Sequence, residues 1–148
     1  MREKLKVYKL LTWYKKVRED KVQSELSKKR KELSELKKEK EKLIRQKKEL
    51  YKRLYEQKTV SAERLKSTFY EANTLNALVE KLEGSISLKK REVEKTKHQL
   101  MEAFKERRLM ERLTEKTEEA WRFEETKRFY KELDDLVILR YEKAENEA

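Results

Sequence analysis

Turn-forming residues are almost absent from this chain, and their scarcity limits its fold more than any other feature of the sequence. Among 148 residues there is one glycine and no proline. Because these two residues supply most tight turns, the backbone can rarely change direction. The strong helix formers Lys, Glu, Leu and Arg dominate the composition. The sequence therefore predicts an all-α protein with few, long helices.

The high charge of the chain fits either a coiled coil or a disordered segment. Charged residues make up 48% of the sequence and hydrophobic residues 36%. The apolar residues recur at regular spacing, which favours a coiled coil. The chain has no cysteine, no apolar run of 18 residues and no signal-peptide pattern. We therefore expect a cytoplasmic protein with no membrane-spanning helix.

The first half of the chain carries a heptad repeat. Its apolar residues are spaced alternately three and four apart, which is the period of a left-handed coiled coil. Lysines interrupt this stripe and are expected to direct their ammonium groups outward to solvent. The apolar members of the stripe are Val22, Leu26, Leu33, Leu36, Leu43, Leu50 and Leu54.

The repeat stops near residue 58, where the residues predict a turn and a new helix. Ser61 suits the N-cap position, and Glu63 in the first turn favours the helix dipole. Val60 and Leu65 have the spacing of a hydrophobic staple. We expect one helical hairpin over residues 1–148, with a first helix at about 3–57, a turn at 58–60 and a second helix at about 61–145. The hairpin is predicted to be a long, two-helix antiparallel coiled coil.

A second heptad stripe runs through the later half and is predicted to slip by half a heptad after Met110. Folding the chain about residue 59 places Leu33 opposite Ile86, and it also places Lys29 unfavourably opposite Lys89. The stripe before the slip contains Leu65, Ala72, Leu75, Val79, Leu82, Ile86, Val93, Leu100, Ala103 and Met110. The stripe after it contains Leu113, Ala120, Phe123, Tyr130, Val137 and Tyr141.

The second helix is predicted to be longer than the first, so residues 115–145 lack a partner within the chain. This segment is nevertheless rich in apolar residues, and the N-terminal segment carries a second apolar stripe of Val7, Leu10, Tyr14 and Val17. Exposed apolar surface normally marks a binding site. Two readings remain open: a partner protein covers this surface, or the two ends cover each other or a second copy of the chain.

The sequence contains no pattern of residues typical of catalysis. There is no cysteine and no glycine-rich loop, and the single histidine, His98, is expected on the surface. The pair Asp134–Asp135 on one helix supplies too few ligands for a metal ion. We therefore expect no enzyme activity, no metal, no cofactor and no small-molecule substrate.

Net charge is divided unevenly between the two halves. Residues 1–58 hold 22 Lys and Arg against 10 Asp and Glu, whereas residues 59–148 hold 19 against 20. A basic segment suggests an acidic partner. Basic runs at 28–31 and 37–42 could contact phosphates. Because acids interleave these runs, nucleic-acid binding is a minor alternative, beside a generic structural coiled coil that self-associates.

Three segments resemble the FliJ family of flagellar export proteins. They are LKVYKLLTWYKKVREDKVQSEL near the N-terminus, MEAFKERRLMERLTEK at 101–116 and RFEETKRFYKELDDLVILRY at 122–141. The likeness covers essentially the whole chain. The stalk proteins of injectisomes (YscO-like) are similar, as are, more distantly, the gamma and D subunits of rotary ATPases.

The resemblance implies a non-enzymatic component of the flagellar type III secretion apparatus, which serves motility. Its termini would insert into a hexameric, FliI-like export ATPase, promote its assembly and activity, and couple it to a FlhA-like export gate. The family is also implied to act as an escort for export chaperones, and to associate peripherally with the export apparatus at the inner membrane. The implied ring contacts are Leu5, Tyr8, Leu11, Trp13, Phe129, Leu133, Leu136 and Val137. The implied gate contacts are Leu75, Leu78, Val79, Leu82 and Ile86.

Overall fold

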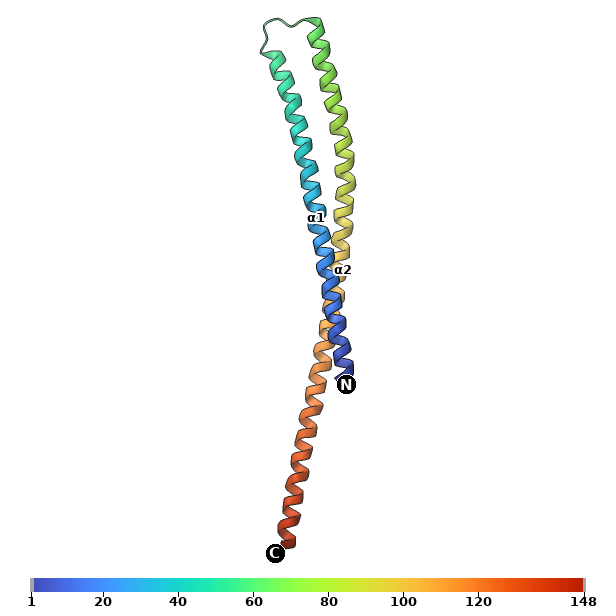
Figure 1. Cartoon of the computed structure of the whole chain (residues 1–148), viewed down its shortest axis with the longest axis vertical. Helices are drawn as coiled ribbons and strands as arrows, with labels where there is room; N and C mark the ends of the chain where they lie inside the picture. The colour runs from blue at the N-terminus through green and yellow to red at the C-terminus, as the bar shows by residue number, and fades with distance from the viewer. Residues whose placement is uncertain (1, 148) are drawn as a thin grey trace. The chain divides into compact units, whose positions relative to one another are not determined.

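Two helices account for nearly all of residues 2–147, which are the residues that the computed structural model describes. Helix α1 spans Arg2–Tyr55 and helix α2 spans Ala62–Glu147. Figure 1 shows α1 from blue to teal and α2 from green to red. The prediction of an all-α fold with a longer second helix is confirmed. Within the described residues, no helix is long and apolar enough to cross a membrane.

A short segment between Tyr55 and Ala62 reverses the chain. The backbone N–H of Arg64 donates to the hydroxyl oxygen of Ser61 at 3.2 Å. This bond satisfies one of the free N–H groups in the first turn of α2. Glu63 lies in the same turn, where its charge favours the helix dipole. The predicted N-cap at Ser61 is therefore confirmed.

The molecule divides into two units. Unit 1 joins Met1–Asp20 to Glu102–Ala148, and unit 2 comprises Lys21–Met101. In each unit a stretch of α1 packs antiparallel against a stretch of α2.

In unit 2 the two helices meet along a narrow seam. Leu26, Ala72, Ile86 and Val93 are its buried apolar residues. Thr96 is a buried polar residue of the seam, and the other seam positions are half-buried. All of them follow the alternating spacing of three and four that a coiled coil requires. The seam of α1 in this unit consists of Val22, Leu26, Lys29, Leu33, Leu36, Lys40, Leu43, Lys47, Leu50 and Leu54. The seam of α2 consists of Thr68, Ala72, Leu75, Val79, Leu82, Ile86, Lys89, Val93, Thr96 and Leu100.

The predicted pairing of Lys29 with Lys89 is wrong. The ammonium of Lys29 donates to the hydroxyl of Thr96 at 3.0 Å, seven residues further along α2. Lys89 instead pairs with Glu32 at 2.7 Å and with Glu92 at 3.2 Å. Matching apolar residues alone ignores that a lysine in the seam needs an acceptor for its ammonium group. The helices therefore adopt a register that gives each lysine a partner.

The predicted slip after Met110 is also wrong. In unit 1, the half-buried positions continue through Thr114, Thr117 and Trp121 without a change of period. Leu113 and Phe123, which the slipped stripe required at the seam, are exposed. Threonine can occupy the seam because Thr114 lies within 2.9 Å of Thr12 on α1. A reading of apolar residues alone does not recognise such a polar layer.

Candidate partner-binding surface

The last part of α2 has no cover from α1. Every described residue from Arg122 to Glu147 is exposed. Figure 1 shows this segment of unit 1 from orange to red, beyond the N-terminal end of α1. At 1.5 Å per residue it is about 38 Å long. The segment thus offers its whole circumference to a partner.

Large apolar side chains crowd this uncovered segment. Leu136 is 61% exposed and Leu133 is 46% exposed. Exposed apolar residues are common singly, but a dense group normally marks an interaction site. We call this group the C-terminal apolar surface. It consists of Phe123, Phe129, Tyr130, Leu133, Leu136, Val137, Ile138, Leu139 and Tyr141.

The C-terminal apolar surface is not a continuation of the seam. Extending the seam of α2 beyond Trp121 by steps of three and four reaches four charged residues, Glu124, Arg128, Lys131 and Asp135, before it meets an apolar one, Ile138. Phe123 follows Trp121 by two residues and so lies about 200° around the helix from it. A longer α1 in the same register would therefore meet mostly charged residues and leave most of the apolar residues uncovered. The partner that covers them must approach from other directions.

The N-terminal segment of α1 also exposes apolar residues. Leu11 and Trp13, two of the predicted ring contacts, are exposed, whereas Tyr8 is half-buried and Leu5 is buried in the seam. The predicted contacts therefore differ in what a partner can reach. Four further exposed residues of this segment are absent from the predicted set, although their heptad spacing signals a stripe: Val7, Leu10, Tyr14 and Val17.

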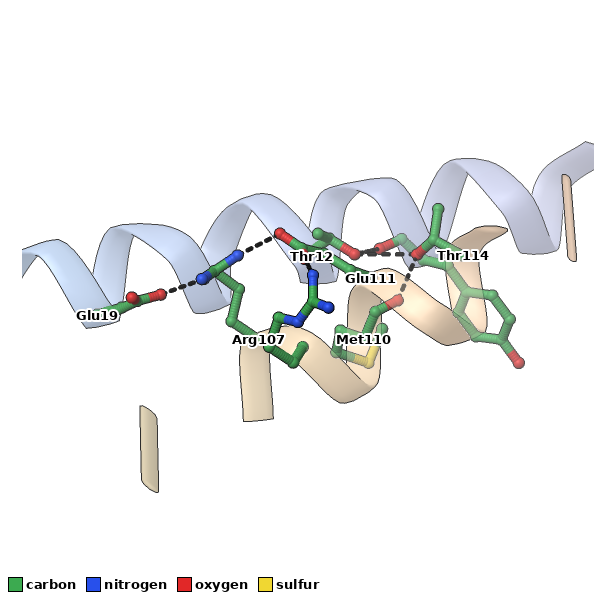
Figure 2. A network of polar contacts seen from close by, with 8 residues as sticks. Thr12, Glu19, Arg107, Met110, Glu111 and Thr114 are labelled. Carbon is green, nitrogen blue, oxygen red and sulfur yellow. Dashed lines mark hydrogen bonds and ion pairs between the residues drawn. The ribbon is translucent and has the colours of Figure 1, made fainter. Parts of the chain in front are cut away.

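Polar contacts join the N-terminal part of α1 to residues 107–114 of α2 in unit 1 (Figure 2). The hydroxyl oxygens of Thr12 and Thr114 lie 2.9 Å apart, and the Thr114 hydroxyl also donates to the carbonyl of Met110 at 2.7 Å. The guanidinium of Arg107 donates to Glu19 on α1 and to Glu111 on its own helix. In the part of unit 1 that the structure describes, the only buried apolar residues are Leu5 and Ala103. Specific polar pairs therefore position α1 next to the start of the uncovered segment.

Several carboxylates beside the seam have pKa values below their ordinary value. A hydrogen bond from Lys15, at 3.0 Å, lowers the pKa of Glu106. Hydrogen bonding from Arg107 lowers the pKa of Glu111, and hydrogen bonding from Lys89 lowers that of Glu32. In each case the partner cation favours the ionised carboxylate. The pKa values fall on folding, so these three contacts stabilise the folded state only while the carboxylates are ionised.

We expect the folded protein to lose stability on acidification. A carboxylate with a lowered pKa stabilises the fold above its ordinary value of 4.5, and this contribution disappears as the pH falls through the folded-state pKa. Urea denaturation followed by circular dichroism should give lower midpoints at pH 3 than at pH 7. The decrease should be smaller in Glu32→Gln/Glu106→Gln, which removes two of the responsible groups. An equal decrease in this variant would contradict the assignment.

The implied gate contacts are mostly turned toward α1. Ile86 is 7% exposed, and Leu75, Val79 and Leu82 are half-buried at seam positions. Leu78 alone among them is exposed, at 45%. A partner of the paired helices can therefore touch Leu78 directly, whereas Ile86 is covered by its own chain.

The arrangement of acidic and histidine side chains gives no candidate metal centre in the described part of the chain. Among residues 2–147, no three such side chains are close enough to hold an ion. His98 lies on the surface, as expected.

Comparison with known proteins assigns the chain to a family. The family model described as the flagellar FliJ protein matches residues 6–146, which is nearly the whole chain. No curated protein and no solved structure gives a significant match. The matched range includes nearly all of both helices and most of the uncovered segment. The chain therefore belongs to the FliJ family of flagellar proteins, which are non-catalytic coiled-coil components of flagellar protein export.

Proposed function

We propose that the protein is a stalk that inserts its terminal segments into the ring of the hexameric flagellar export ATPase. The observation that carries this proposal is the C-terminal apolar surface, exposed on a part of α2 that α1 does not cover. The start of α1 adds further exposed apolar residues at the same end of unit 1, among them Leu11 and Trp13.

The distribution of the apolar side chains around the helix favours an enclosing partner. Leu136, Val137, Ile138 and Leu139 are consecutive and all exposed. Successive residues turn by about 100°, so these four span about 300° of the circumference. A flat protein surface covers one side of a helix only. A ring with the helix in its central opening meets every side.

Burial of these side chains supplies free energy for binding. Fully burying one Leu, Ile, Val or Phe side chain stabilises by about 1.5–3 kcal/mol. The C-terminal apolar surface has seven such side chains and two tyrosines, and all of them except Leu133 are more than half exposed. Association costs several kcal/mol in lost freedom. Covering most of the surface therefore supplies free energy of the same order as that cost, which is about 4–15 kcal/mol.

The stalk acts on the ATPase by contact, not by chemistry of its own. A helix bearing different side chains on each side touches the subunits of a ring unequally. Such unequal contact favours some conformations of the subunits over others, which shifts their equilibrium. In this way the protein promotes assembly and ATP hydrolysis of the ring.

A contact with the export gate uses unit 2 in this proposal. Leu78 is the accessible member of the implied gate contacts, and Leu88 lies exposed ten residues later on α2. We propose that these exposed leucines, rather than the buried Ile86, touch the gate. The contact links the ATPase to export at the inner membrane, and the protein is peripheral to that apparatus.

Photo-crosslinking tests the insertion directly. Replacing Phe129 with the photoreactive p-benzoylphenylalanine in the full chain should give a covalent product with the export ATPase, because Phe129 belongs to the enclosed surface. The same replacement at Tyr55, which is 84% exposed at the end of α1, is the matched control and should give none. Products between two copies of the chain, with none to the ATPase, would favour self-association and contradict the proposal.

A further inference from the structure

Almost all of the net charge of the protein lies in unit 2. Residues 21–101 hold 23 Lys and Arg against 13 Asp and Glu, which is +10 of the total of +11. Within this unit, residues 21–55 of α1 hold 14 basic residues against 6 acidic ones. Unit 1 is nearly neutral by comparison. The excess positive charge therefore lies mostly in the α1 part of unit 2 rather than across the whole molecule.

The heptad register places this positive charge on the outside of α1. The outermost position of each heptad in this part of the helix is Lys31, Lys38, Arg45 or Lys52, and all four side chains are exposed. Glu25, Glu32 and Glu39 occupy the flank beside the seam, where Glu32 pairs with Lys89 of α2 at 2.7 Å. We call the outward basic group the basic ridge. It consists of Lys28, Lys31, Lys38, Lys42, Arg45, Lys48 and Lys52.

Carboxylates of the protein leave this ridge largely unneutralised. Among residues 2–147, Arg45 is the one ridge side chain with a carboxylate within 4.0 Å, that of Glu41 at 3.9 Å. Lys31 and Lys52 are separated by 21 residues, so the ridge extends along about 32 Å of α1 with an outermost charge every ~10.5 Å. The seven basic side chains of the ridge outnumber the three carboxylates on the same face, Glu35, Glu41 and Glu49, and a row of excess positive charge of this length attracts an extended anionic surface.

The residue types of the ridge argue against a protein partner. Protein interfaces depend on a few anchors, mostly Trp, Tyr and Arg, set in apolar surroundings. The ridge has six lysines and one arginine, and Ser27 and Ser34 are its small neighbours on the outer face. Lysine is a point charge that contacts phosphate from many directions, without the fixed geometry of an arginine–carboxylate pair.

The acidic residues beside the ridge argue against a nucleic acid. Glu35 and Glu49 lie on the outer face of α1, among the lysines. Phosphates of a nucleic acid are fixed along its backbone, so some would be held next to these carboxylates. Lipids move laterally in a bilayer, and anionic headgroups can gather at the lysines while neutral ones face the glutamates.

We propose that the basic ridge binds the surface of a bilayer that contains anionic lipids. The ridge carries no aromatic or aliphatic side chain for insertion, so the contact is electrostatic and weakens steeply with salt. Each lysine near such a surface strengthens binding about fivefold at low salt. This site lies in unit 2 and does not depend on the terminal segments or on the ATPase.

Vesicle co-sedimentation of the full chain tests the proposal. The protein should sediment with vesicles of phosphatidylcholine and phosphatidylglycerol at low salt, and not with phosphatidylcholine alone. Lys31→Glu/Lys38→Glu/Arg45→Glu/Lys52→Glu should weaken binding at least 100-fold. The control Lys66→Glu/Lys90→Glu/Arg91→Glu/Lys95→Glu makes the same charge change at exposed positions of α2 and should weaken binding less than tenfold.

Three outcomes would overturn the proposal. They are no sedimentation of the wild-type chain with anionic vesicles, equal loss in both variants, and tighter ridge-dependent binding to duplex DNA than to vesicles. Circular dichroism checks that each variant is helical. If the ridge variant is not, the four Gln substitutions at the same positions halve the charge change, and they should still weaken binding more than tenfold.

Discussion

Stimulation of the export ATPase should be lost in Leu133→Asp/Leu136→Asp. Both leucines belong to the C-terminal apolar surface and neither contacts α1, so the substitutions leave the seam intact. In the proposed complex each aspartate would be buried without a partner. A buried, unpaired charge costs several kcal/mol. Steady-state ATP hydrolysis by the hexamer, titrated with the full chain, should therefore show wild-type stimulation and none with the variant.

The matched control for this experiment is Met101→Asp/Leu109→Asp. It makes the same kind of change, a large exposed apolar side chain to aspartate, at two positions of α2 outside the uncovered segment. Stimulation by this control should stay close to that of the wild-type chain. Circular dichroism should show equal helicity in all three proteins, because aspartate lowers helix propensity by less than about 1 kcal/mol per site. Undiminished stimulation by Leu133→Asp/Leu136→Asp would exclude the terminal contact.

The elements of the fold follow from local features of the sequence. The lack of Pro and near-lack of Gly limit how often the chain can reverse, and Ser61 marks the reversal by capping the helix that follows. The stripe through Leu26 and Leu33 has the period of a coiled coil, and these residues lie at the seam. Such signals involve residues close in sequence, so periodicity and capping rules are sufficient to find them.

The register between the helices did not follow from the same signals. It depends on which polar side chains meet across the seam, as Lys29 meets Thr96 and Thr12 meets Thr114. Buried polar residues of this kind fix the register of coiled coils at a cost in stability. An apolar pattern treats them as interruptions and therefore pairs the wrong residues. The partner of a seam lysine is far away in sequence, and no local rule identifies it.

The exposure of the candidate site residues could be predicted where it follows from the lengths of the two helices. It could not be predicted where it depends on the register between them. Leu133 and Leu136 are exposed because α1 has ended. The resemblance implied Leu5, Leu11, Leu78 and Ile86 alike as partner contacts, yet Leu5 and Ile86 are buried whereas Leu11 and Leu78 are exposed. Which side of a helix faces its partner is set by the pairing across the seam. Periodicity locates an apolar stripe on a helix, but it does not show which residues the other helix covers.

The stability of the helix pair should fall by about 2–4 kcal/mol in Leu26→Ala. Leu26 is 4% exposed in the seam of unit 2, where few side chains are fully buried. Truncation of a buried leucine removes its transfer free energy and leaves a cavity. A two-helix seam lies close to solvent, so water can enter part of that cavity and the loss should be in the lower half of the usual range. Urea denaturation followed at 222 nm measures it.

Leu88→Ala is the matched control, because Leu88 lies in the same unit but is 62% exposed. The two substitutions remove the same atoms and change helix propensity equally, since alanine is the better helix former in both places. They differ only in what surrounded the leucine. Leu88→Ala should therefore change the free energy of unfolding by less than about 0.5 kcal/mol. Equal losses at the two positions would mean that Leu26 does not face α2, and the register set by Lys29 with Thr96 would have to be abandoned.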